Sequence, residues 1–275
     1  MRILVCIPSW GTKNSSHLNR ILSEYDDIAQ KYDVDILLFL TDDLDVSRHN
    51  NVNIKKIFFP REIKYLLVHQ YKRYMSARLN KYDIFIYSED DILISKKNID
   101  SFMSLSKDLS GTNLVPSFIR YEIKKGDKYK YLIDLHPGNA TSRYGTLLSR
   151  FIAFKNRYFK GNIIFRVHHL TDSVYIEPNN LHSGCFILDR NQLRVAIESG
   201  NFQKGPRGGY CGVLESAASD IYYRCSLQKV YPLDKLESLL VHHLPDKYVT
   251  ELGEKYKYNK ATVPNPKKVR QILDL

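Results

Sequence analysis

The stretch Tyr82-Asp83-Ile84-Phe85-Ile86-Tyr87-Ser88-Glu89-Asp90-Asp91-Ile92 decides the fold. An apolar run typical of a buried strand leads directly into three consecutive carboxylates. In α/β proteins the carboxyl ends of strands open into the crevice where ligands bind. Three acids crowded there repel one another, and a hard divalent cation such as Mg2+ or Mn2+ relieves the repulsion by taking oxygen ligands. The alternative is a solvated acidic loop that follows a strand.

Apolar runs upstream of this stretch predict further strands of the same sheet. They cover residues 3–7, 34–40 and 52–59, and residues 62–80 have an amphipathic helical pattern. The order strand, helix, strand, strand, helix, strand predicts an α/β fold with a mostly parallel central sheet flanked by helices. Ser15 or Ser16 is the expected cap of the first helix. The apolar face of that helix consists of Leu18, Ile21, Leu22, Tyr25 and Ile28.

Downstream of the acidic stretch the pattern is less regular. Residues 114–123 and 129–135 are expected to be extended, whereas residues 136–180 have no clear period, which predicts an irregular, substrate-facing insertion. No linker-like boundary interrupts the chain, so a single domain is predicted. The remaining elements are a strand at 183–188, helices at 191–199 and 213–225, short extended pieces at 230–233 and 239–241, and a basic tail after Gly253.

The composition favours a folded protein with anionic partners. Of the 275 residues, 43% are hydrophobic and 26% charged, which is ordinary for a globular protein. The net charge of +11 favours nucleotides, phosphorylated lipid carriers or a membrane surface as partners. Zinc-finger spacing and a long basic amphipathic helix are both absent from the sequence, which argues against nucleic-acid binding.

Cysteine usage and hydropathy predict a cytoplasmic protein. Cys6, Cys185, Cys211 and Cys225 form no CxxC pair, and the first two lie in apolar runs where a free thiol behaves as a small hydrophobe. The N-terminal apolar run is expected to be a strand and not a signal peptide. No segment approaches the roughly 20 apolar residues that a membrane span needs. Peripheral association with a membrane is compatible with the positive charge.

The strand ends together resemble those of the GT-A class of nucleotide-sugar glycosyltransferases, which have a Rossmann-like fold. Glu89-Asp90-Asp91 is similar to the Glu-Asp-Asp form of the DxD motif in the N-acetylglucosaminyltransferase I group. Ser183-Gly184-Cys185-Phe186 resembles the small-residue strand that lines the acceptor side. The resemblance implies one GT-A domain, with a nucleotide-sugar-binding half at 1–110, an acceptor-binding half at 111–252 and a surface tail at 253–275.

The resemblance also implies a metal site late in the chain. Asp91 would be the direct ligand of Mn2+ or Mg2+, and one of His242 and His243 would complete the shell. Neighbours on an extended strand point to opposite faces, so only one of the two histidines is expected to bind. The alternative roles are a turn for the acid and a structural position for both histidines.

A catalytic base on a helix is implied in the same way. Glu215 or Asp220 would take the proton of the acceptor hydroxyl, and their spacing places them on different sides of the predicted helix. An ion pair between Asp220 and Arg224, four residues later, is the alternative for Asp220.

The donor site follows from the same resemblance. Ribose or a metal-bound water would contact Glu89 or Asp90, and the diphosphate would be held by arginines, because guanidinium groups suit phosphate. Turn chemistry and a solvated helix face are the alternatives for the strand-end acids and the arginines. Pro8, Ser9 and Trp10 are assigned to the nucleotide pocket. Asp42 or Asp43 is assigned to the base or ribose, and Arg73 and Arg78 to the diphosphate.

The expected function is therefore a metal-dependent glycosyltransferase. It would transfer a sugar from a UDP- or GDP-sugar to a hydroxyl of a glycan, glycolipid or glycoprotein, with inversion favoured by direct displacement. A nucleotidyltransferase is the first alternative, although Pro8-Ser9-Trp10-Gly11 offers only one glycine where such enzymes carry a glycine-rich loop. A non-catalytic basic module that binds polyanions is the second.

Overall fold

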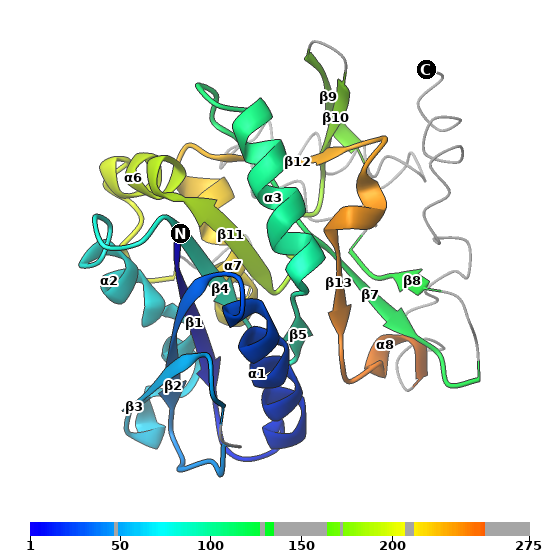
Figure 1. The fold of residues 1–275 in the computed structure, drawn as a ribbon. Coiled ribbons are helices and arrows are strands. Elements are labelled where there is room, and N and C mark those ends of the chain that lie inside the picture. The colour runs from blue at the N-terminus through cyan, green and yellow to red at the C-terminus, as the bar shows by residue number, and fades with distance from the viewer. Residues whose placement is uncertain (47–48, 127–129, 135–163, 171–172, 207–211, 251–275) are drawn as a thin grey trace.

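The structure is a computed structural model that describes residues 1–275 except 47–48, 127–129, 135–163, 171–172, 207–211 and 251–275. Its largest sheet has the order β11-β4-β1-β2-β3 (Figure 1). β1, β2, β3 and β4 are mutually parallel where they pair, and β11 runs antiparallel to β4. The prediction of an α/β fold with a mostly parallel sheet is confirmed. These strands are β1 (Arg2–Ser9), β2 (Asp33–Leu40), β3 (Asn53–Phe58), β4 (Ile84–Ser88) and β11 (Cys185–Asp189).

The first helix, α1 (Ser15–Ala29), buries the five apolar residues that the sequence predicts. Its cap differs from the prediction. Asn14 precedes the helix and makes no side-chain cap hydrogen bond. Its amide donates instead to Asp90 Oδ1 at 2.8 Å, so this polar side chain serves the acidic turn after β4 and not the helix end.

The helix predicted over residues 62–80 is wrong as a single element. The chain forms a 3-10 segment, η1 (Arg61–His69), and then a short helix, α2 (Tyr71–Ser76). Lys64 interrupts η1 with φ 46° and ψ −129°, a conformation that breaks the helical period. The apolar residues of this region are therefore divided between two short segments. Leu67 is buried, whereas Leu66 is exposed.

Two smaller sheets contain the other described strands. One has the order β6-β12-β10-β9 and the other the order β5-β13-β7-β8. β9 (Ile164–Leu170) and β10 (Ser173–Pro178) pair in antiparallel fashion, so residues 164–170 and 173–178 of the predicted irregular insertion are regular. The first part of that insertion lies outside the described residues. The other strands are β5 (Ile92–Leu93), β6 (Leu114–Pro116), β7 (Ile119–Ile123), β8 (Lys130–Leu132), β12 (Gln228–Pro232) and β13 (Leu240–His243).

Helices pack around these sheets and complete the described chain. None of the described helices is both long and apolar enough to cross a membrane. They include α3 (Lys96–Asp108), α6 (Arg190–Glu198), α7 (Val213–Arg224), η2 (Leu236–Leu239) and α8 (Lys247–Thr250).

The junction of two sheets positions the acidic stretch. β4 ends at Ser88, and after three intervening residues the chain enters β5, which pairs with β13. In that register His243 lies opposite Ile92, next to Asp91. The turn after β4 therefore lies beside β13, and β7, which pairs in parallel with β13, is the next strand of that sheet (Figure 1).

Candidate functional site

A cavity of about 640 Å3 lies at the carboxyl ends of β1 and β4. It combines three acids in sequence with cationic, aromatic and apolar side chains from η1, β7, α7 and α8. A second cavity, of about 400 Å3 between β9, β10 and α7, is lined by none of the predicted site residues. The larger cavity is lined by Pro8, Trp10, Asn14, Lys64, Tyr65, Leu67, Val68, Glu89, Asp90, Asp91, Arg120, His182, Leu214, Glu215, His243, Lys247 and Tyr248.

The first two acids of the turn are held in an environment that disfavours their charge. Burial, with the neighbouring Asp91 carboxylate, raises the pKa of Glu89 to about 8. Burial also raises the pKa of Asp90 to about 6, although Ser9 Oγ donates to Asp90 Oδ2 at 2.6 Å. Glu89 packs against Gly184, where an added Cβ would lie 3.1 Å from Glu89 Oε2. Since Gly184 also has φ +64°, both the tight contact and the backbone conformation favour glycine here.

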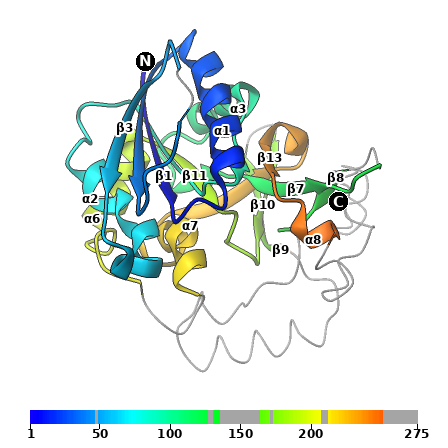
Figure 2. The same ribbon diagram turned by 90° about the horizontal axis from the view of Figure 1, so that it is seen from below.

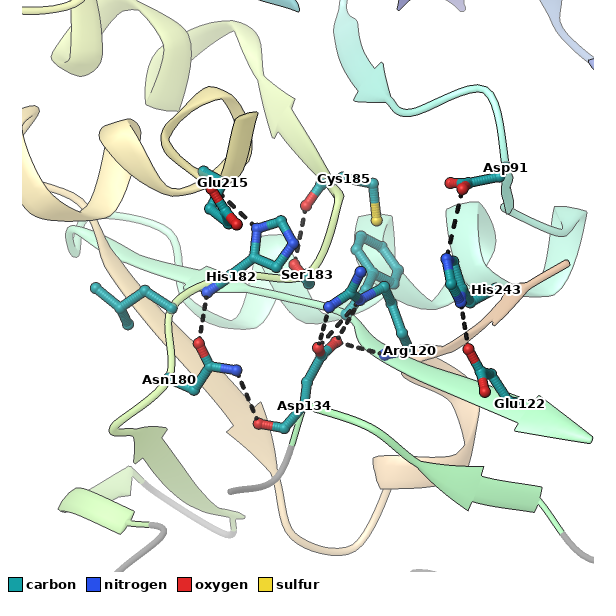
Figure 3. A network of polar contacts seen from close by, with 12 residues as sticks. Asp91, Arg120, Glu122, Asp134, Asn180, His182, Ser183, Cys185, Glu215 and His243 are labelled. Atoms are coloured by element: carbon teal, nitrogen blue, oxygen red, sulfur yellow. Dashed lines mark hydrogen bonds and ion pairs between the residues drawn. The ribbon is translucent and has the colours of Figure 1, made fainter. Parts of the chain in front are cut away.

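Asp91 belongs to a chain of polar contacts that crosses from β4 to β7. His243 Nε2 lies 3.4 Å from Asp91 Oδ2, and His243 Nδ1 donates to Glu122 Oε1 at 2.5 Å (Figure 3). Burial alone would raise the pKa of Asp91, but the hydrogen bond and charge of His243 outweigh it and lower that pKa. Glu122 is fixed in turn by the backbone N–H of Val249 at 2.8 Å. The imidazole is therefore oriented by one carboxylate and aimed at the other.

A buried ion pair stands beside this chain. Arg120 donates from Nε and Nη2 to Asp134 Oδ1 at 3.0 and 2.8 Å, and its backbone N–H donates to Asp134 Oδ2 at 2.8 Å. Arg120 also lines the cavity and so provides a fixed positive group next to the acids. His182 lies on the far side of Arg120, with Nδ1 3.3 Å from the carbonyl oxygen of Glu215 (Figure 3). Burial, with the nearby Arg120 charge, lowers the pKa of His182 to about 3.

The two predicted bases have different surroundings. Glu215 is exposed, lines the cavity and folds back over Gly212, where an added Cβ would lie 2.0 Å from Glu215 Oε2. Asp220 is buried one and a half turns further along α7. Its Oδ2 accepts from Lys72 Nζ at 2.7 Å and lies 3.6 Å from Arg224 Nη1, the partner that the i,i+4 spacing predicts. Glu215 therefore lines the same cavity as the acids, whereas Asp220 forms a buried ion pair.

The two predicted histidines also have different surroundings. His243 reaches Asp91, while His242 stacks on the Tyr121 ring at 4.8 Å and places Nε2 3.2 Å from Asp246 Oδ1. Adjacent residues of a strand point to opposite faces, and this alternation produces the difference.

Several residues predicted for the donor lie away from the cavity lining. Asp42 forms a side-chain ion pair with Arg61, and Asp43 an exposed one with Lys56 at 2.9 Å. The two arginines predicted to bind the diphosphate contact aromatic rings instead of the acids. The Arg73 guanidinium lies over the rings of Phe59 and Tyr74, and that of Arg78 lies over Tyr74. Pro8 and Trp10 do line the cavity, and Ser9 lies behind them on Asp90.

Sequence reasoning missed the residues that reach the site from β7 and α8. Arg120, Glu122 and Lys247 lie in stretches of sequence with no recognisable motif. Asp134 pairs with Arg120, and only the fold brings these two residues together. The alternation in Ile119-Arg120-Tyr121-Glu122-Ile123 carried a usable signal. Arg120 and Glu122 lie on one side of an extended segment that is otherwise apolar or aromatic, and buried charges require partners.

The donor set fits a divalent cation in part. Asp91 Oδ1 is buried without a hydrogen-bond partner, and Glu89 and Asp90 lie beside it. The Glu122–His243–Asp91 chain has the form in which a carboxylate orients a ligating imidazole. Within the described residues, no three His, Cys, Asp or Glu side chains are already arranged as a closed metal site. The unpartnered oxygen is the observation that favours an ion.

Comparison of the sequence with models of protein families and with curated proteins finds no match. The geometry of the cavity is therefore what indicates a function.

Proposed function

We propose that the protein is a metal-dependent glycosyltransferase of the GT-A type that moves a sugar from a nucleotide diphosphate sugar to an acceptor hydroxyl. The observation that carries the proposal is the acidic turn of Glu89, Asp90 and Asp91 at the end of β4, which lines one cavity together with Glu215. Asp91 Oδ1, with Glu89 and the Nε2 side of His243, would hold Mn2+ or Mg2+. Such an ion supplies stabilisation of the charge on the leaving diphosphate.

The chain's own side chains would share the remaining work. Trp10 and Tyr65 are aromatic faces at the cavity mouth on which a base or sugar ring can stack. Arg120, held by Asp134, and Lys247 offer positive groups for phosphate oxygens. Asn14 and Ser9 hold Asp90 in place, because each donates a hydrogen bond to its carboxylate.

Glu215 is the favoured general base. Its carboxylate would take the proton of the acceptor hydroxyl while that oxygen bonds to the anomeric carbon. The bond from this carbon to the diphosphate oxygen breaks, and the diphosphate leaves with the electron pair. Attack opposite the leaving group inverts the configuration. Asp220 is less suited to the role, because Lys72 already occupies Oδ2.

Donor binding and turnover test the proposal directly. Thermal shifts are measured with a panel of UDP- and GDP-sugars, with and without Mn2+, because a ligand that binds the folded state raises Tm. Donor hydrolysis or transfer is then followed for the protein, for Asp91→Asn and for the control Asp43→Asn, whose carboxylate is exposed and pairs with Lys56. We expect Asp91→Asn and excess chelator each to abolish turnover. Full activity in chelator, or the absence of any donor-dependent shift, would overturn the proposal.

A further inference from the structure

Exposed apolar side chains gather around the mouth of the cavity. Trp10, Tyr65, Leu66, Val213 and Leu214 are 38% to 61% exposed, and three of them, Trp10, Tyr65 and Leu214, also line the cavity. We call these five residues the apolar rim. Contiguous exposed apolar surface on a folded protein usually marks an interaction site. The rim adjoins the site where the acceptor would enter.

Hydrogen bonds join the two main segments of the rim, which lie in η1 and at the start of α7. His69 Nε2 in η1 lies 2.9 Å from the carbonyl oxygen of Val213, and the Tyr71 hydroxyl donates to the carbonyl of Ala217 at 2.8 Å. Figure 2 shows the cyan segment after β3 beside the yellow helix α7. The rim is therefore a fixed platform and not a pair of independent loops.

Backbone strain presents part of this platform to solvent. Lys64 adopts φ 46°, a conformation that non-glycine residues rarely take. Tyr65 and Leu66 follow the kink and are exposed, whereas Leu67 is buried. Strain that the surrounding structure maintains, at a place where it exposes apolar groups, points to a function for the exposure.

The charges near the rim favour a lipid surface over a protein partner. Lys64 and Lys247 line the cavity and Lys13 is exposed three residues after Trp10, so lysines outnumber the exposed Glu62 and Glu215 of the rim segments, and the whole chain carries +11. Lysine is depleted from the cores of protein interfaces. Anionic headgroups, in contrast, attract lysines beside an apolar surface. Indole and phenol rings with polar tips suit the boundary between headgroups and acyl chains.

We propose that the apolar rim docks on a bilayer that contains anionic lipids. Trp10 and Tyr65 lie at headgroup level, and Leu66, Val213 and Leu214 enter the acyl region. The consequence for the acceptor rests on the proposed function: the cavity mouth then faces the bilayer, and the acceptor is a glycan attached to a lipid. Docking of this kind needs no membrane-spanning helix, because its strength depends on buried apolar area and on attraction to anionic lipid.

The single tryptophan of the chain makes docking measurable without a label. The full chain, without donor or metal, is titrated with phosphatidylcholine vesicles that contain or lack phosphatidylglycerol. We expect a blue shift of Trp10 emission with the anionic vesicles, and quenching by lipids with brominated acyl chains. The double variant Leu66→Ser/Val213→Ser keeps the reporter and changes residues outside the cavity lining, and it should partition about tenfold more weakly.

A matched control removes exposed apolar groups elsewhere. Phe58 at the end of β3 and Val195 on α6 are 55% and 38% exposed, and Phe58→Ser/Val195→Ser should bind vesicles as the unmodified protein does. Circular dichroism verifies that both double variants are folded.

Each contrary outcome overturns the docking proposal. These outcomes are no blue shift with any vesicle, equal weakening by the rim and control variants, or a shift that arises from concentration alone without vesicles. The last would identify self-association as the use of the rim. Because the measurement contains neither donor nor metal, its failure leaves the proposed function standing. Vesicle binding without any donor turnover would instead refute the proposed function alone.

Discussion

Glu89 should make the stability of the metal-free protein depend on pH. Its pKa is raised from 4.5 to about 8, mainly by burial. In the unfolded chain the carboxyl has its ordinary pKa. Between these values the folded state holds a proton that the unfolded state has released, so the free energy of unfolding falls as pH rises. Each pH unit corresponds to about 1.4 kcal/mol. The whole interval is then worth about 5 kcal/mol, which partial exposure of the side chain reduces to roughly 2–3 kcal/mol.

Urea denaturation in excess chelator, at several pH values from 5 to 8, measures this dependence. We compare the unmodified protein with Glu89→Gln and with Glu198→Gln, whose side chain is exposed on α6. Asp90 and His243 stay in every variant, so their own titration contributes to all three curves. Between pH 5 and pH 8 the unmodified protein should lose roughly 2–3 kcal/mol more than Glu89→Gln does. Glu198→Gln should follow the unmodified protein. Parallel curves for the unmodified protein and Glu89→Gln would refute the reasoning.

Further predictions concern the base, the histidines and the close approach at β11. Glu215→Gln should lower turnover about 10²–10⁴-fold with little change in donor affinity. Asp220→Asn should instead cost roughly 3 kcal/mol of stability by leaving Lys72 without its charged partner. If Asp220→Asn lost turnover and Glu215→Gln lost stability, the roles of the two residues would be exchanged. His243→Ala should weaken Mn2+ and donor binding together in a calorimetric titration, and His242→Ala should change neither, so equal effects would remove the distinction drawn from β13. Gly184→Ala should lower the free energy of unfolding by about 1–2 kcal/mol from the positive φ alone, which a lower urea midpoint would report. An unchanged midpoint would show that Glu89 and the backbone adjust freely.

Local patterns predicted much of the fold. The strands β1, β2 and β4 are continuous apolar runs, and such runs identify a buried strand without information from elsewhere in the chain. The buried face of α1 follows from spacing alone, because helical periodicity is set by the backbone. The kink in η1 carries no comparable signal. Lys64 is an ordinary residue in an amphipathic run, and nothing in its immediate sequence predicts the positive φ that it adopts.

The site was predictable only where one segment contains it. The acidic turn and the separation of His242 from His243 follow from a strand end and from the alternation of a strand. Glu122 lies 121 residues before His243, and Lys72 lies 148 residues before Asp220. Those pairings depend on which strands and helices become neighbours, and sequence spacing does not specify that.

The arrangement of buried charges explains why the acidic turn is suited to a cation. Asp134 is neutralised by Arg120, and His243 is shared between Glu122 and Asp91. Across the part of the chain that the structure describes, no ion pair is formed by Glu89 or Asp90, and the pKa of each is raised. A proton can relieve their repulsion below about pH 8, and a divalent ion can relieve it above. If an ion takes the place of these protons, Mn2+ should stabilise the protein more at pH 8 than at pH 5, and it should reduce the difference between the unmodified protein and Glu89→Gln. A stabilisation by Mn2+ that is equal at both pH values would place the ion elsewhere.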